Sequence, residues 1–168
     1  QNLHEYFKKF YDTVFFPTLK KEGIDTVIDM GDTFDTRKGI DFWSLNWAKE
    51  NYFNILRDMG ITVHTIVGNH TAYYKDTNDI NSVDLLLREY DNIVVYGSPT
   101  ETSIGGLDMF FIPWINDENR SETMGLIDST KAKVAFGHLE MRGFFANKMY
   151  ICEHGDDKTN YSKFEKVF

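Results

Sequence analysis

Side chains that can bind metal ions or move protons occur at three places where a predicted β-strand ends in glycine. Asp32, the pair Asn69 and His70, and His138 each come directly after such a glycine. Glycine lets the chain turn sharply, so the next side chain points over the edge of the sheet. Ligands of α/β folds gather at the carboxyl ends of the strands. A carboxylate, an amide oxygen and an imidazole suit Mn, Fe or Zn better than a soft metal, so the pattern predicts a shared metal site.

Helices and strands alternate along the chain, which predicts an α/β fold with a largely parallel central sheet. Apolar residues at helical spacing predict a first helix that Pro17 should kink or split. Asp41 is the expected N-cap residue of the second helix. The predicted helices are 3–22, 41–58, 82–90 and 119–129, and the predicted strands are 24–30, 61–67, 92–96, 107–114, 133–136 and 163–168.

Glycines indicate two of the connections. Gly105-Gly106 is expected to form a turn that joins the strand 92–96 to the strand 107–114. After Gly143 the pattern is typical of a loop, until the last strand begins near residue 163.

The composition excludes several classes of protein. The 168 residues are 42% hydrophobic and 15% aromatic, which is too apolar for an intrinsically disordered chain and sufficient for one domain with a core. No apolar run approaches the ~18 residues of a membrane span, so no membrane association is expected. Cys152 is the single cysteine, which excludes an internal disulfide and any CxxC zinc site.

The charge distribution argues for divalent cations if the protein handles phosphates. The chain has 26 acidic and 18 basic side chains, a formal net charge of −8, and no basic tail or stripe. A protein that tracks nucleic-acid phosphates without sequence preference usually has such a stripe. An acidic protein that binds phosphates must first neutralise its own carboxylates, and divalent metal ions do so.

The motifs GDTFD, GNH and GH, in this order, resemble those of the calcineurin-like metallophosphoesterase superfamily. The longer segments IDTVIDMGDTFDTRKGI, ITVHTIVGNHTAYYK, FFIPW and AFGHLEMRGFF are similar to the SbcD-type DNA repair nucleases, and most of all to the recombination endonuclease subunits of tailed bacteriophages. The resemblance implies one domain over 1–168 with a four-layer α/β/β/α sandwich. It also implies that the chain is truncated at both ends, because the first (Asp-x-His) and last (Gly-His-x-His) metal-binding segments of the family fall outside it.

The same resemblance assigns roles to individual residues. Asp32 corresponds to the carboxylate that bridges two divalent ions, and Asn69 and His138 correspond to ligands of one of them. Manganese is the expected metal, with Mg, Fe or Zn as alternatives. His70 occupies the position of the catalytic histidine, which stabilises the transition state and protonates the leaving oxygen.

Residues around these motifs leave alternatives open. Thr71 stands where the family usually has Asp; a threonine can still hydrogen-bond to the imidazole of His70 but brings no charge. Asp35 either supports the Asp32 loop as an acceptor, which we favour, or approaches the substrate. Arg37 and its neighbour Lys38 either meet a DNA phosphate or form a solvated surface pair.

Other histidines and aromatic residues have structural interpretations. His64, in the middle of a strand, is expected in the core, His4 on the surface of the first helix, and His154 in a loop. Trp43, Trp47 and Phe53 are expected in the core or in an interface. The family uses this region for dimer contacts, which makes a homodimer the expected assembly.

The expected function is that of a metal-dependent DNA nuclease subunit that hydrolyses phosphodiester bonds in recombination and repair. The family works with an SMC-like ABC ATPase, which must be a separate chain because no Gly-Lys-Ser/Thr P-loop occurs here. The expected location is the bacterial cytoplasm, with a phage gene as one origin, and the 168-residue piece alone should be an impaired nuclease. The alternatives are a different phosphoesterase of the superfamily and a non-catalytic scaffold with the same fold.

Overall fold

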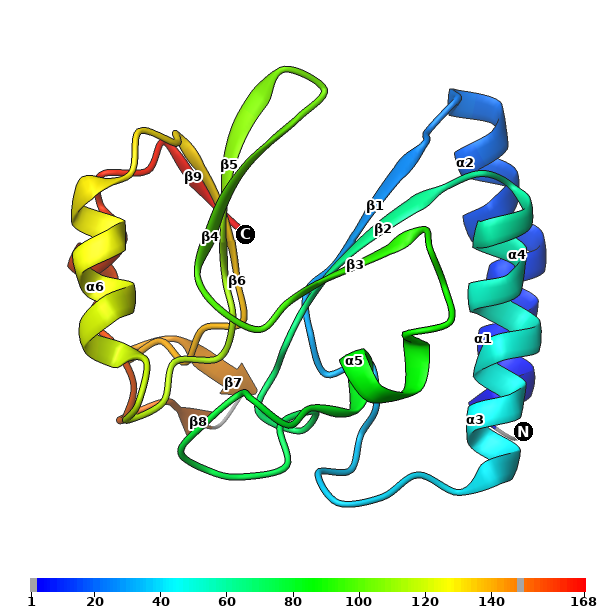
Figure 1. Cartoon of the computed structure of the whole chain (residues 1–168), viewed down its shortest axis with the longest axis horizontal. Helices are drawn as coiled ribbons and strands as arrows, with labels where there is room; N and C mark the ends of the chain where they lie inside the picture. Colours follow the sequence, from blue (N-terminus) through cyan, green and yellow to red (C-terminus); the bar gives the residue numbers. More distant parts are fainter. Residues whose placement is uncertain (1–2, 148–149) are drawn as a thin grey trace.

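The fold consists of two β-sheets packed against each other with helices on both outer faces (Figure 1). The computed structural model describes residues 3–147 and 150–168. The first sheet has the parallel order β1-β2-β3, and the second has the order β4-β5-β6-β9. These strands are β1 (Thr26–Asp29), β2 (Thr62–Ile66), β3 (Ile93–Tyr96), β4 (Thr100–Ile104), β5 (Leu107–Ile112), β6 (Val134–Gly137) and β9 (Lys166–Val167).

Three apolar layers hold this arrangement together. Ile66, Tyr96 and Phe111 form a cluster between the two sheets, and the rings of Tyr96 and Phe111 are stacked at 4.1 Å. Further clusters pack the N-terminal helices on the first sheet and α6 (Arg120–Ser129) on the second. The α/β/β/α sandwich that the family resemblance implies is therefore confirmed, whereas the single central sheet expected from the strand pattern is wrong.

The two long helices expected at the N-terminal side form, each with a π-helical turn in its middle. They are α1 (Leu3–Phe10), η1 (Tyr11–Phe15) and α2 (Phe16–Glu22), followed later by α3 (Phe42–Ala48), η2 (Lys49–Phe53) and α4 (Asn54–Asp58). Pro17 lies in the first turn of α2, directly after η1, and the backbone on both sides of this junction stays right-handed helical. The helix was expected to kink or split at Pro17, but it continues through a π-helical turn. The wider turn accommodates the missing N–H of the proline.

The side chain of Asp41 caps α3 as expected. Its carboxylate accepts hydrogen bonds from the backbone N of Ser44 at 2.8 Å and from the Ser44 hydroxyl at 2.7 Å. This cap sets where the helix begins after the long loop that follows β1.

Gly105-Gly106 forms a turn as expected, but the turn does not join the strand 92–96 to the strand 107–114. This turn joins β4 to β5, which pair antiparallel from Ile104 opposite Leu107 to Thr100 opposite Phe111. The strand β3 belongs to the other sheet. The polar sequence TETSI of β4 did not identify it as a strand, because only alternate side chains of an edge strand are partly covered.

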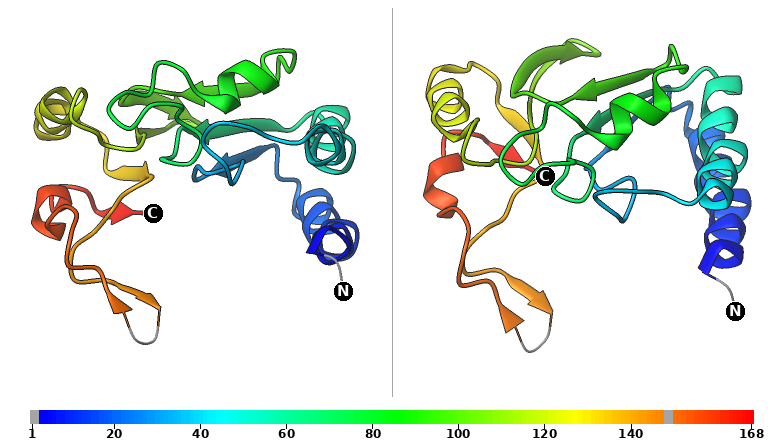
Figure 2. Two further views of the ribbon diagram at one scale, coloured as in Figure 1. Left: turned by 90° about the horizontal axis from the view of Figure 1, so that it is seen from below. Right: turned by 60° about the horizontal axis from the view of Figure 1, so that its bottom comes forward.

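The segment after Gly143 contains a small hairpin where only a loop was expected. β7 (Phe145–Asn147) pairs with β8 (Tyr150–Ile151), and the hairpin projects from the body of the molecule (Figure 2). Hydrogen bonds from Gly143 N to Cys152 O and from Cys152 N to Phe144 O extend this pairing at its base. The chain then continues through η3 (Lys158–Tyr161) to β9, the expected last strand.

A buried carboxylate fixes the segment that follows β6. Asp156 accepts hydrogen bonds from Arg120 on α6 at 2.5 Å and from the hydroxyl of Tyr161 at 3.0 Å. Its backbone N donates to Glu140 O, and its backbone O accepts from Arg142 N. The start of the hairpin is thereby tied to the outer helix of the second sheet.

Two histidines outside the motifs lie in apolar surroundings. His64 is buried in β2, where its Nδ1 lies 2.7 Å from the hydroxyl of Tyr96, and burial lowers the pKa of this imidazole. The expectation of a core histidine is confirmed. His4 is half-buried rather than on the open surface, because its ring packs edge-on against Trp43 and Trp47.

Within the described part of the chain, no helix is both long and apolar enough to cross a bilayer.

Candidate metal centre

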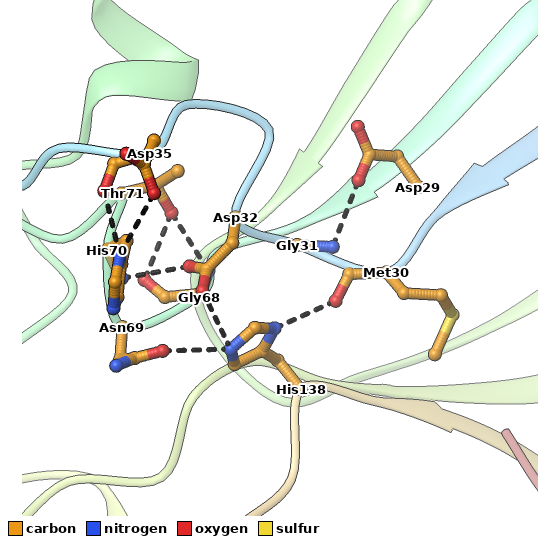
Figure 3. A network of polar contacts seen from close by, with 10 residues as sticks. All are labelled: Asp29, Met30, Gly31, Asp32, Asp35, Gly68, Asn69, His70, Thr71 and His138. Carbon is orange, nitrogen blue, oxygen red and sulfur yellow. Dashed lines mark hydrogen bonds and ion pairs between the residues drawn. The ribbon is translucent and has the colours of Figure 1, made fainter. Parts of the chain in front are cut away.

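The three glycine-terminated strands end at one rim of the molecule, where the two sheets meet. β1 and β2 bring Asp32 and Asn69 from the first sheet, and β6 brings His138 from the second (Figure 3). Met30 leads from β1 into this site and supplies a carbonyl oxygen to it. The structure therefore brings together three side chains that lie up to 106 positions apart in the sequence.

The hydrogen bonds of His138 determine which of its nitrogens faces the centre. Nδ1 lies 2.9 Å from the carbonyl oxygen of Met30, which can only accept, so Nδ1 carries the proton. In the neutral imidazole, Nε2 then carries a lone pair and no proton. It lies 3.0 Å from Oδ1 of Asn69 and 3.4 Å from Oδ2 of Asp32, neither of which has a proton to give. Nε2 of His138, Oδ1 of Asn69 and Oδ2 of Asp32 thus converge as three atoms that can bind a metal ion.

This donor set fits a divalent cation of the hard or borderline class. A neutral imidazole nitrogen, an amide oxygen and a carboxylate oxygen are all metal ligands, and without a cation they repel one another. Among the described residues, no group of three His, Cys, Asp or Glu side chains is placed to hold a metal ion. The candidate set of three ligands therefore includes an amide, that of Asn69.

Close packing around Asp32 explains two of the glycines. A Cβ on Gly68 would overlap Oδ1 of Asp32 and come within 2.7 Å of its backbone N. A Cβ on Gly31 would lie 2.6 Å from Nδ1 of His138, and Gly31 also has φ +99°. Asp32 itself has φ +54°, and its Oδ1 accepts a hydrogen bond from His70 N at 2.8 Å. The two loops therefore meet only because both positions lack a side chain.

The ring of His70 is oriented by a main-chain carbonyl. Its Nδ1 lies 2.7 Å from the backbone O of Asp35, whereas the carboxylate of Asp35 is 3.8 Å away and 99% exposed. Because the carbonyl binds the Nδ1 proton, interactions of this half-exposed ring with a ligand fall to Nε2. Asp35 thus acts as an acceptor through its backbone carbonyl, and the group that it supports is the ring of His70, whereas support of the Asp32 loop was expected.

Thr71 has a different role from the one expected. Its hydroxyl donates to Gly68 O at 3.0 Å and accepts from Gly68 N at 2.9 Å, and its side chain is buried. The hydroxyl therefore closes the turn that carries Asn69 and His70. The hydrogen bond to the imidazole that a threonine could offer is made by Asp35 O instead.

Arg37 is held by protein groups. Its Nη1 donates to Ala72 O at 3.1 Å and to Tyr74 O at 2.8 Å, and its guanidinium lies over the ring of Trp114 at 5.2 Å. Lys38 lies over the ring of Tyr73 at the same distance. Neither interpretation of this pair included these contacts: Arg37 holds the loop after His70 through hydrogen bonds to two of its carbonyl oxygens.

Asp29 is a residue of the site that the sequence interpretation missed. Its Oδ1 accepts from Gly31 N at 3.0 Å and its Oδ2 from the hydroxyl of Thr33 at 2.9 Å, which shapes the turn before Asp32. Burial raises the pKa of the Asp29 carboxyl, and these two hydrogen bonds partly offset the rise. A carboxylate at the end of an otherwise apolar strand was the available signal.

Comparison with known proteins agrees with this geometry. The model of the family described as calcineurin-like phosphoesterase matches residues 2–167, so the chain belongs to that family, whose members generally use two divalent metal ions. A relative of known name is Exonuclease subunit 1 of Enterobacteria phage T4, to which the chain is 41% identical over 129 residues. That alignment covers 77% of this chain and 38% of the relative, so the chain spans well under half of that protein. The resemblance stated from the motifs is confirmed.

The close approach at Gly68 predicts a large effect of one methyl group. Gly68→Ala should lower the free energy of unfolding by about 1–3 kcal/mol, because the added Cβ displaces Asp32. The amide of His70, which donates to Asp32, should also exchange faster with deuterium. Urea unfolding and hydrogen exchange measure the two effects. Gly39→Ala is the matched control, since no atom lies within 4 Å of a Cβ there; equal stability of the two variants would contradict the analysis.

Proposed function

We propose that this chain is the central part of a metal-dependent DNA nuclease subunit that hydrolyses phosphodiester bonds in recombination and repair. The proposal is supported by membership of the phosphoesterase family and by 41% identity to an exonuclease subunit of a phage. The observation that carries it is the convergence of Nε2 of His138, Oδ1 of Asn69 and Oδ2 of Asp32, with Nε2 3.0 Å from the amide oxygen and 3.4 Å from the carboxylate oxygen.

We propose that Asp32, Asn69 and His138 hold the metal, with Asp32 shared between two ions. Manganese suits this mixture of carboxylate, amide and imidazole ligands best, and Mg, Fe or Zn are the alternatives. When bound, such a pair of ions neutralises phosphate charge and activates water for an in-line displacement. The first and last metal-binding segments of the family are proposed to lie outside 1–168, so this piece alone should be impaired.

His70 is proposed to hold the proton that the leaving oxygen needs. The carbonyl of Asp35 fixes the ring through Nδ1, so that Nε2 is the atom from which a proton can be donated to a ligand. The hydrogen bond from His70 N to Asp32 places this imidazole beside the candidate metal ligands. The chain thereby combines a charge-neutralising centre with an oriented acid.

The substrate and partners are part of the same proposal. DNA is the proposed substrate, and the name of the phage relative, an exonuclease subunit, supports a multi-chain enzyme. An ATPase of the SMC-like ABC type on another chain is the proposed partner, as the resemblance of the motifs to the SbcD-type nucleases implies. A bacterial cytoplasm is the proposed location, which the phage origin of the relative supports.

An exposed apolar surface supports a homodimer. It consists of α1 and the start of α3, and we call it the α1–α3 surface. Trp43 is 57% and Phe42 is 89% exposed there, although such large side chains are usually covered. The surface residues are Leu3, Tyr6, Phe7, Phe10, Phe42 and Trp43.

Metal binding tests the centre of the proposal. Asp32→Asn keeps the size of the side chain and an acceptor for His70 N but removes the charge, so Mn²⁺ binding should weaken by more than about tenfold. Isothermal titration calorimetry measures the affinity, and Asp108→Asn, an exposed carboxylate on β5, should behave as wild type. Equal affinities of wild type and Asp32→Asn would contradict the centre. Absence of Mn²⁺ binding to both would mean either that the family's first and last metal-binding segments are indispensable or that the fold serves as a non-catalytic scaffold.

The role of His70 predicts an effect that depends on the leaving group. In the Mn-loaded protein, His70→Ala should reduce cleavage of linear duplex DNA by about 10²–10⁴-fold, because an alkoxide must be protonated as it leaves. Hydrolysis of bis(p-nitrophenyl) phosphate should fall far less, since p-nitrophenolate leaves without a proton. The affinity for Mn²⁺ should not change. His154→Ala, in an exposed loop, is the control. Equal losses on both substrates would rule out proton donation, and turnover of phosphoserine peptides but not DNA would favour a different phosphoesterase.

The homodimer predicts a change of mass with one substitution. Trp43→Glu places a charge in the α1–α3 surface, so a wild-type particle of twice 19.6 kDa should become one of 19.6 kDa. Sedimentation equilibrium measures the mass. Leu107→Glu, which changes an exposed apolar residue at the β4–β5 turn, should leave the dimer intact. An unchanged mass of Trp43→Glu would contradict this interface.

A further inference from the structure

A cavity opens beside the candidate metal centre, and three of the side chains that line it are those of tryptophan and phenylalanine. Its volume is about 400 Å³, within the ~300–1,000 Å³ usual for small-molecule sites. Asn69 and His138 form part of its wall, so the cavity is continuous with the centre. Trp114 enters it from the end of β5, and Phe144 and Phe145 enter it from the hairpin.

Trp114 is a rigid part of this wall. Its backbone N donates to Val67 O at 2.8 Å, and its backbone O accepts from the side-chain amides of Asn78 and Asn119, both at 3.0 Å. The guanidinium of Arg37 lies over its ring. Three hydrogen bonds therefore hold the backbone of Trp114 in place, and the guanidinium of Arg37 contacts the indole itself.

The hairpin side of the cavity exposes two phenylalanines. Phe144 is 55% and Phe145 is 69% exposed, although both belong to a segment that hydrogen bonds hold at its base. The hairpin projects from the body of the molecule (Figure 2), and Phe144 and Phe145 line the same cavity as Asn69 and His138. Apolar side chains that stay exposed next to a polar site commonly serve a ligand.

The charges of the lining decide between a base and a phosphate. Among the described residues, no lysine or arginine lines this cavity, and Glu140 adds a negative charge to it. A phosphate is disfavoured there, whereas a neutral base is not. Stacking of a base on aromatic rings also needs no cation and tolerates any sequence.

We infer that this aromatic cavity binds an unpaired nucleobase of the strand whose phosphate lies at the metal centre. The inference rests on the proposed nuclease function and narrows its substrate to single-stranded or frayed DNA ends. A base in an intact duplex is covered on both faces by its neighbours and has to leave the stack to enter such a cavity. Trp114 and Phe144 are the side chains on which the base stacks, and they act by positioning the strand.

The test is a binding measurement that does not depend on cleavage. A short single-stranded oligodeoxynucleotide with 2-aminopurine at its end is titrated with the purified chain in Mg²⁺, which does not quench the fluorophore. Stacking on the protein should quench 2-aminopurine, and both Trp114→Ala and Phe144→Ala should weaken binding by about tenfold or more. Phe144 is largely exposed, so its variant should fold even if Trp114→Ala does not.

Controls separate this inference from the proposed function. Leu107→Ala, at the far end of the strands, should bind as wild type, and an oligonucleotide with an abasic terminal position should compete at least about tenfold less well. Wild-type affinity of Phe144→Ala, or equal competition by the abasic strand, would overturn the inference. The calorimetric comparison of wild type with Asp32→Asn reports on the metal centre independently. If Asp32→Asn bound Mn²⁺ as tightly as wild type while the quenching still depended on the base, the metal centre would be refuted and the base site would not.

Discussion

The contact between the imidazole of His138 and the carbonyl of Met30 connects the two sheets where the candidate site lies. It is a single hydrogen bond of 2.9 Å, but it has two consequences. It holds the end of β6 against the end of β1. It also places a proton on Nδ1, so that in the neutral imidazole the lone pair of Nε2 faces Asp32 and Asn69. Gly31 is required beneath it, because any Cβ there would lie 2.6 Å from Nδ1.

The rest of the fold keeps this contact at one geometry. The apolar layer of Ile66, Tyr96 and Phe111 fixes the separation of the sheets, and the hydrogen bond from Trp114 N to Val67 O joins them a second time near the rim. Asn78 adds a polar link, since its buried amide reaches both Gly97 O and Trp114 O. Such satisfied buried amides favour one arrangement of the loops, because each alternative leaves a polar group without a partner.

In the proposed function, the metal centre and the aromatic cavity contribute differently to the binding of a nucleic-acid strand. Metal ions at Asp32 would offset the charge of an acidic chain, whose net charge is −8, so the protein itself needs no basic stripe. The aromatic cavity would add affinity without charge. In this proposal an acidic chain binds a polyanionic substrate because the metal ions attract the phosphates, while stacking and His70 orient the strand.

Much of the candidate site was predictable from local sequence. Glycine after an apolar strand specifies a sharp turn by itself, so the residue order alone places Asp32, Asn69, His70 and His138 at strand ends. Only the tertiary structure decided that two sheets form, because periodicity reports whether a side chain is covered and not which strand lies beside it. It likewise moved the support of His70 from a side chain to the carbonyl of Asp35, since main-chain acceptors leave no trace in the residue type. Trp114 became part of the site only through contacts with distant loops, which no local pattern encodes.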